Sequence, residues 1–130
     1  MNRRRQAFLE QPHTRAQGRL GEDEGVAWLR RQGYRIGERN FSSRAGEIDV
    51  VATEGDTLCF IEIKARASDA YGAAIEAVSP QKQRRIARAA ALYLARKPFS
   101  GPCRFDVLGM DLGEEGWHFT LLRDAFTVPG

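Results

Sequence analysis

Two apolar segments joined by a short polar turn constrain the fold of this chain more than any other feature. The first runs from Glu47 to Ala52, the second from Leu58 to Lys64, and Gly55-Asp56 lies between them. Runs rich in Val, Ile and Phe around a glycine-containing turn are typical of a β-hairpin. Since both faces of the strands are apolar near the turn, we expect this hairpin in the middle of a covered sheet.

The rest of the sequence predicts one α/β domain with a mixed central sheet flanked by helices. At 130 residues the chain has the usual size of a single domain. Capping residues and hydrophobic patterns predict the element order α-β-β-β-α-β-β. We divide the chain into a mobile basic arm (1–17), the domain (18–126) and a short tail (127–130). Besides the hairpin, we expect two helices, from Gly18 to Gln32 and from Pro80 to Lys97. We also expect a short strand from Tyr34 and the strands Arg104–Met110 and Trp117–Leu122, with a turn-prone stretch at Asn40–Gly46.

Composition excludes several classes of protein. The chain is 42% hydrophobic and 28% charged with a net charge of +3, which is ordinary for a globular domain. No apolar run approaches the roughly 20 residues of a membrane helix, and no secretory signal follows the N-terminal arginines, so we expect a cytoplasmic protein without membrane contact. Cys59 and Cys103 lack zinc-site spacing and are interpreted as reduced core residues. There is no GxxxxGK[ST] loop for ATP.

The far end of the predicted hairpin carries a group of charges. Alternation along the strands places Glu47 and Asp49 on one face, and a Gly55-Asp56 turn or a four-residue loop would pair Asp49 with Glu62 and Glu47 with Lys64. Neighbouring carboxylates repel each other unless a cation lies between them. An Mg²⁺ ion, or Mn²⁺, would relieve this repulsion, and Lys64 could orient an attacking water. The structural alternative is a polar strand end held by ion pairs.

These segments also carry a family resemblance. GEIDVVA followed by FIEIKAR resembles the D-x(n)-E-x-K core of the PD-(D/E)XK nuclease superfamily, with Ile48 where the superfamily name has proline. More narrowly, the chain resembles the YraN-type family of small bacterial proteins, which is related to archaeal Holliday-junction resolvases. The likeness runs from Gly18 to Phe126, through Gly21-Glu22, Gly33-Tyr34, Tyr71-Gly72, Lys82-Gln83 and Arg104-Phe105-Asp106-Val107.

The resemblance implies a restriction-endonuclease-like fold and a metal-dependent endonuclease that acts on structured or branched DNA. It implies metal ligation by Asp49 and Glu62, a catalytic role for Lys64, and Glu22 as the additional acid on the first helix, with Glu24 as the competing candidate. Glu47 is included among the catalytic candidates because of its expected place beside Lys64. Cutting a four-way junction on two strands would require a two-fold homodimer.

The second helix is basic and contains no acid. Its hydrophobic positions should face the sheet and leave the bases toward solvent. This face is either a solvated surface or a site that contacts nucleic-acid phosphates. The candidate contacts are Lys82, Arg84, Arg85 and Arg88.

A non-catalytic nucleic-acid-binding module and a protein-interaction scaffold remain alternative functions. Asp106 could support the site or bond to Arg104, His118 is expected to be a packed or edge residue, and His13 lies in the arm.

Overall fold

The computed structural model describes residues 15–67 and 78–127, which form an α/β fold with the expected element order. Five strands make one sheet in the order β1-β2-β3-β4-β5, and two helices flank it. The bounds are α2 (Arg15–Arg31), β1 (Arg35–Ser43), β2 (Gly46–Glu54), β3 (Thr57–Ala67), α3 (Pro80–Arg96), β4 (Cys103–Gly113) and β5 (Gly116–Phe126). Within the described ranges, neither helix has the length and apolar character to cross a membrane.

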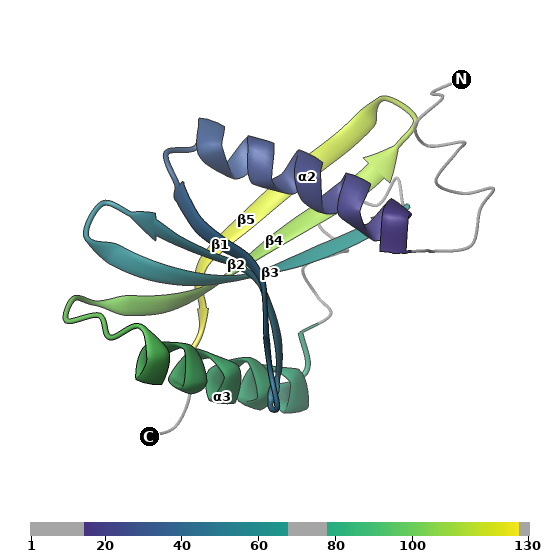
Figure 1. Ribbon diagram of the computed structural model, residues 1–130. Coiled ribbons are helices and arrows are strands. Elements are labelled where there is room, and N and C mark those ends of the chain that lie inside the picture. The colour runs from purple at the N-terminus through teal and green to yellow at the C-terminus, as the bar shows by residue number, and fades with distance from the viewer. Residues whose placement is uncertain (1–14, 68–77, 128–130) are drawn as a thin grey trace.

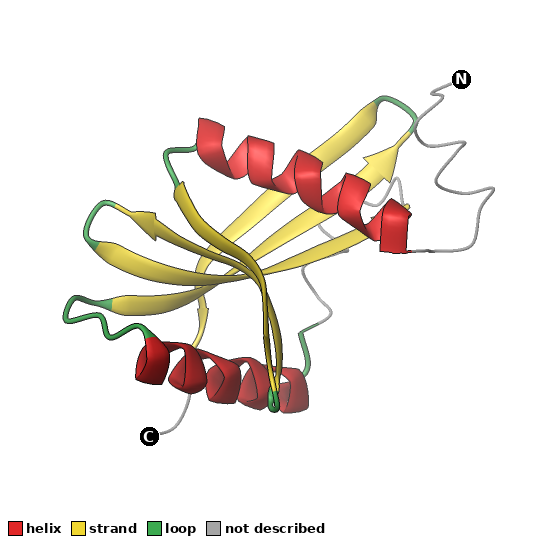
Figure 2. Cartoon of the chain, in the orientation of Figure 1, coloured by secondary structure: helices red, strands yellow, loops and turns green. Residues whose placement is uncertain are grey.

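The helices cover opposite faces of the sheet (Figures 1 and 2). One core cluster packs beneath α2 around Leu29, Ile61 and Leu108, and another packs against α3 around Phe60 and Tyr93. The connection from β3 to β4 includes α3, which covers one face of the sheet, and β3 and β4 are parallel while the other strand pairs are antiparallel. The strongly apolar β3 is the central strand, as its sequence predicts.

The hairpin register agrees with the sequence expectation near the turn. Glu54 pairs with Thr57 and Val50 pairs with Ile61, which leaves Gly55-Asp56 as a two-residue turn. Gly55 has a φ of 61°, a conformation that costs glycine little because it has no Cβ. The alternative of a four-residue loop is therefore excluded.

Some element boundaries differ from those expected. Helix α2 begins at Arg15 rather than Gly18, and β1 continues to Ser43 through the stretch expected to form a turn. The reason is Phe41, which is buried against α3 with its ring edge-on to Tyr93. Cys59 is buried as expected, but Cys103 is exposed at the start of β4, so its assignment to the core is wrong. The expectations for 1–14, including His13, for Tyr71-Gly72 and for 128–130 concern residues outside the described ranges.

The side chains of β2 do not alternate regularly between the two faces of the sheet along the whole strand. Ile48 packs in the cluster against α3, whereas Val50 packs beneath α2, so the alternation expected for this strand fails at Ile48. On the neighbouring strand Asn40 adopts a positive φ of 55°. A Cβ built on Gly46 would lie 3.0 Å from the Arg85 side chain, since the end of the β1-β2 hairpin folds down onto α3 (Figure 1).

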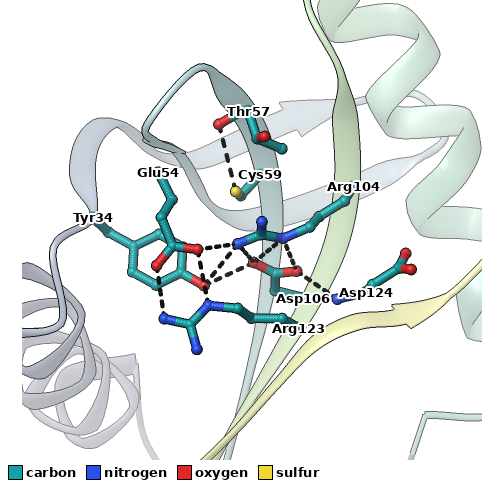
Figure 3. Close-up of polar contacts among 8 residues, drawn as sticks. All are labelled: Tyr34, Glu54, Thr57, Cys59, Arg104, Asp106, Arg123 and Asp124. Atoms are coloured by element: carbon teal, nitrogen blue, oxygen red, sulfur yellow. Dashed lines mark hydrogen bonds and ion pairs between the residues drawn. The ribbon is translucent and has the colours of Figure 1, made fainter.

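A polar network that is buried at its centre lies near the opposite end of β2 (Figure 3). We call it the Arg104 network, and its members are Tyr34, Glu54, Arg104, Asp106, Arg123 and Asp124. Asp106 accepts bonds from Tyr34 Oη, Arg104 Nε and the Asp124 backbone N–H, each at 2.9 Å. Glu54 accepts from both Arg104 and Arg123. Of the two roles considered for Asp106, the structure therefore shows the bond to Arg104.

Candidate functional site

The candidate site lies where β2 and β3 separate. Their ladder ends at the pair Val50 and Ile61, just before Asp49. There the Ile63 backbone N–H donates to Asp49 Oδ2 at 2.7 Å, so a carboxylate replaces the next rung between the strands. The bend of β2 toward α3 opens this fork. The apolar residues on either side of Asp49 thus determine where its side chain is held.

Glu62 is the second acid at the fork. It lies on the central strand, is only 7% exposed, and is close enough to Asp49 for the two side chains to form a hydrogen bond. Its Oε1 lies 2.7 Å from the ammonium of Lys82, which comes from the first turn of α3. A buried carboxylate that keeps its charge needs such a cationic partner.

Glu22 approaches the same place from α2. Helix and sheet come close together one turn further on, where a Cβ on Gly25 would lie 2.9 Å from the Met110 sulfur. The Glu22 side chain is 14% exposed, and its Oε1 lies 3.5 Å from Arg39 without a hydrogen-bond partner among the described residues. Its charge contributes to the electrostatic field at Asp49. We call Glu22, Asp49 and Glu62, together with Lys64 and Lys82, the acid cluster.

The acid cluster raises the pKa of Asp49 to about 7. Burial is the largest cause, followed by the negative charge of Glu62, and the negative charge of Glu22 raises the pKa further. The bond from the Ile63 N–H favours the ionised form but does not outweigh them. A carboxyl group with this pKa is partly protonated at neutral pH. A bound cation would take the place of the proton and relieve the repulsion between Asp49 and Glu62.

Two lysines border these acids. Burial lowers the pKa of Lys64, and the neighbouring Lys82 lowers it further. Burial also disfavours the charged form of Lys82, but its contact with Glu62 prevails and raises its pKa. Lys64 therefore loses its proton more readily than an ordinary lysine, which suits a group that orients or deprotonates water.

Two of the predicted placements differ from the observed ones. Glu47 is exposed and accepts a bond of 3.2 Å from Ser42 Oγ, and the β2-β3 ladder does not reach it, so its predicted pairing with Lys64 is wrong. The bend of β2 carries it away from β3. Lys82 was expected on the solvent face with Arg84, Arg85 and Arg88, and those three arginines are exposed. Lys82 instead turns in to Glu62.

The inward position of Lys82 had one signal in the sequence. Ser79 caps α3, and its Oγ accepts the Lys82 backbone N–H at 3.2 Å, which places this lysine in the first turn. The helix dipole favours acids in that turn, and α3 has none there. A base at this position indicates an acid partner from outside the helix.

The acid cluster offers the chemistry that a hard divalent cation prefers, which is carboxylate oxygen. In their present arrangement the described acids, histidines and cysteines form no group of three that could hold a metal ion. Glu22 Oε1 is buried and accepts no hydrogen bond among the described residues, although Arg39 lies 3.5 Å away. This atom and the raised pKa of Asp49 fit a cation between the acids, whereas Glu62 is paired with Lys82. The residue types therefore fit a metal ion, provided that Glu62 releases Lys82 and binds the ion instead.

Comparison with known proteins places the chain in a family. The model of "Uncharacterised protein family UPF0102" matches residues 21–110, which include every member of the acid cluster. The chain belongs to the UPF0102 family. Arg123 and Asp124 of the Arg104 network lie outside the matched region.

Relatives within UPF0102 are similar over most of their length. The UPF0102 protein of Herminiimonas arsenicoxydans is 44% identical over 112 residues, covering 85% of this chain and 90% of its own. That of Syntrophus aciditrophicus (strain SB) is 46% identical over 112 residues, covering 85% and 88%. The UPF0102 protein of Alkalilimnicola ehrlichii is 42% identical over the full length of both chains.

Proposed function

We propose that this UPF0102 protein is a metal-dependent endonuclease that hydrolyses phosphodiester bonds in DNA. The observation that carries the proposal is the placement of Asp49 beside Glu62 and Lys64 at the fork between two strands, with Glu22 near enough for its charge to act on Asp49. The resemblance of GEIDVVA and FIEIKAR to the PD-(D/E)XK nuclease core supports the same reading.

In this proposal the acids and Lys64 have different tasks. Asp49, Glu62 and Glu22 would hold Mg²⁺ or Mn²⁺ through carboxylate oxygens. The bound cation would supply Lewis-acid stabilisation of the negative charge that develops on the phosphodiester. Lys64 would orient the attacking water or accept its proton, and its lowered pKa favours that role.

The outer face of α3 supports DNA as the partner. Arg84, Arg85 and Arg88 are exposed on a helix without acids, so their charges are available to backbone phosphates. Such contacts carry no sequence information, which suits an enzyme that recognises the shape of its DNA. Branched DNA is the substrate we propose because of the resemblance to Holliday-junction resolvases, and paired cuts at a four-way junction would require a two-fold dimer.

The test is cleavage of a labelled four-way junction, a linear duplex of the same sequence and a supercoiled plasmid, with Mg²⁺, Mn²⁺ or EDTA. We expect metal-dependent cleavage that favours the junction. Asp49→Asn, Glu62→Gln and Lys64→Ala should each lower the rate by about 100-fold or more. Asp56→Asn, in the exposed turn at the other end of the same hairpin, should leave the rate unchanged.

Two results would contradict the proposal. Cleavage that survives all three substitutions would assign it to a contaminating enzyme. DNA binding by the wild-type protein with no cleavage under any metal would favour the alternative function, a nucleic-acid-binding module that keeps the fold.

A further inference from the structure

The Lys82 side chain is held differently from the other bases of α3. Its backbone is fixed by the Ser79 cap, and its side chain is 33% exposed with the ammonium 2.7 Å from Glu62 Oε1. Arg84 and Arg88 on the same helix are exposed to solvent. Lys82 therefore belongs to the interior of the acid cluster, although the DNA-facing surface begins next to it.

The contact with Glu62 satisfies an electrostatic need of the site without a metal. Glu62 and Asp49 are close enough to share a hydrogen bond, and both are largely buried, so their charges repel each other. An ammonium on Glu62 compensates one of them. A divalent cation that uses a Glu62 oxygen must compete with this ammonium, since both are attracted to the same carboxylate.

We propose that Lys82 is an internal counter-ion that occupies Glu62 in the metal-free protein and is displaced when a divalent cation binds. This inference rests on the proposed function, because it concerns the same metal site. Lys82 is thus a positioning residue that keeps the acid cluster folded and holds its metal affinity low. The proposed metal site and the basic face of α3 are connected through this one side chain.

The experiment is calorimetric titration of Mn²⁺ at pH 8, without DNA, into the wild-type protein and three variants. Lys82→Met removes the competing charge, and we expect it to bind Mn²⁺ about tenfold more tightly. Lys82→Gln can still donate to Glu62 without a charge, so its affinity should lie in between. Arg84→Met is the matched control, because it loses one positive charge from the exposed side of the same helix. Its affinity should stay within about twofold of wild type.

Stability supplies a second readout that does not depend on tight binding. In EDTA, Lys82→Met should unfold at lower urea concentration than Arg84→Met, because Glu62 loses its partner. Added Mn²⁺ should shift the urea midpoint of Lys82→Met further than that of wild type.

The outcomes separate this inference from the proposed function. If Lys82→Met binds Mn²⁺ as tightly as wild type, or more weakly, the counter-ion role is overturned. The proposed metal site is not contradicted by either result. Binding by Lys82→Met alone would support the competition in its strongest form. Absence of binding in every protein would overturn both proposals.

Discussion

The acid cluster and the Arg104 network are two groups of partly buried charges in one small domain, and they are organised in opposite ways. In the Arg104 network two acids meet two arginines, and Asp106 accepts three bonds at 2.9 Å. The arginine contacts lower the pKa of Glu54 to about 2. At the fork, burial and like charge raise the pKa of Asp49 to about 7.

The difference separates acids that are paired within the fold from acids whose charges repel one another. A network whose acids are paired lowers the free energy of the folded state, and its acids need no cation beyond the arginines already present. A cluster in which buried acids lie beside one another costs stability through the repulsion of their charges, and a bound cation would recover that cost. Perturbed carboxylates of the second kind are typical of functional sites. Three substitutions test this contrast, and the first has the largest expected effect.

Asp106→Ala should destabilise the protein by about 3–5 kcal/mol, because it leaves Arg104 and the Asp124 N–H without their buried acceptor. Asp106 is 1% exposed, so water cannot readily replace the lost bonds. Urea unfolding at pH 7 measures the change. Mn²⁺ affinity of the folded variant should equal that of wild type. A loss below about 1 kcal/mol would show that the network is not a structural one.

Asp49→Asn should stabilise the metal-free protein by about 1–2 kcal/mol at pH 8, since it removes a repelled charge and its amide oxygen can still accept the Ile63 N–H. The sign follows from a pKa that folding raises from 3.8 to about 7. Protonated Asp49 contributes stability that is complete below pH 3.8 and is lost as the pH rises through about 7, where the carboxyl group of the folded protein ionises.

Urea unfolding in EDTA at several pH values provides the check for Asp49→Asn. The variant should gain on wild type between pH 4 and 7 and keep a constant advantage above that range. Destabilisation at pH 8 would mean that ionised Asp49 is a structural residue, and the contrast between the two clusters would fail.

Arg123→Met should have the smallest effect, at most about 1 kcal/mol at pH 7, because the Arg123 side chain is 46% exposed and its ion pair is screened by solvent. The effect should depend on acid. Ionised Glu54 stabilises the fold above its ordinary pKa of 4.5, and this stability is lost as the pH falls through about 2. Without Arg123 the folded-state pKa of Glu54 is higher, so this stability is smaller and its loss is complete at a higher pH. An acid titration followed by circular dichroism measures the change. An unchanged acid transition would remove Arg123 from the network.

Much of the fold was predictable because local patterns and tertiary packing agree. The Gly55-Asp56 turn, the apolar central strand and the Ser79 cap of α3 each specify their own structure through short-range chemistry. The extension of β1 through Phe41 was not predicted, because a single aromatic residue among polar neighbours has no period of its own. Its burial depends on α3, which follows much later in the chain.

The site was predictable to the extent that strand register determines it. Alternation and the hairpin turn brought Asp49 and Glu62 together in the prediction, and the two carboxyl groups do interact. Regular alternation also predicted that Glu47 would meet Lys64, and this failed because β2 bends toward α3 beyond Asp49. A bend of this kind is set by packing on both faces of a sheet, which the period of one strand does not contain.

The sequence by itself therefore determined the order of the elements and the register of the central hairpin near its turn. Only the tertiary structure decided which charges meet, because α2, β2, β3 and α3 all contribute to the acid cluster. The close packing of α2 at Gly25 brings Glu22 near enough for its charge to act on Asp49, and Lys82 contacts Glu62 from the first turn of α3. Contacts between distant segments follow from the packing of whole elements, whereas turns, caps and alternation follow from neighbours along the chain.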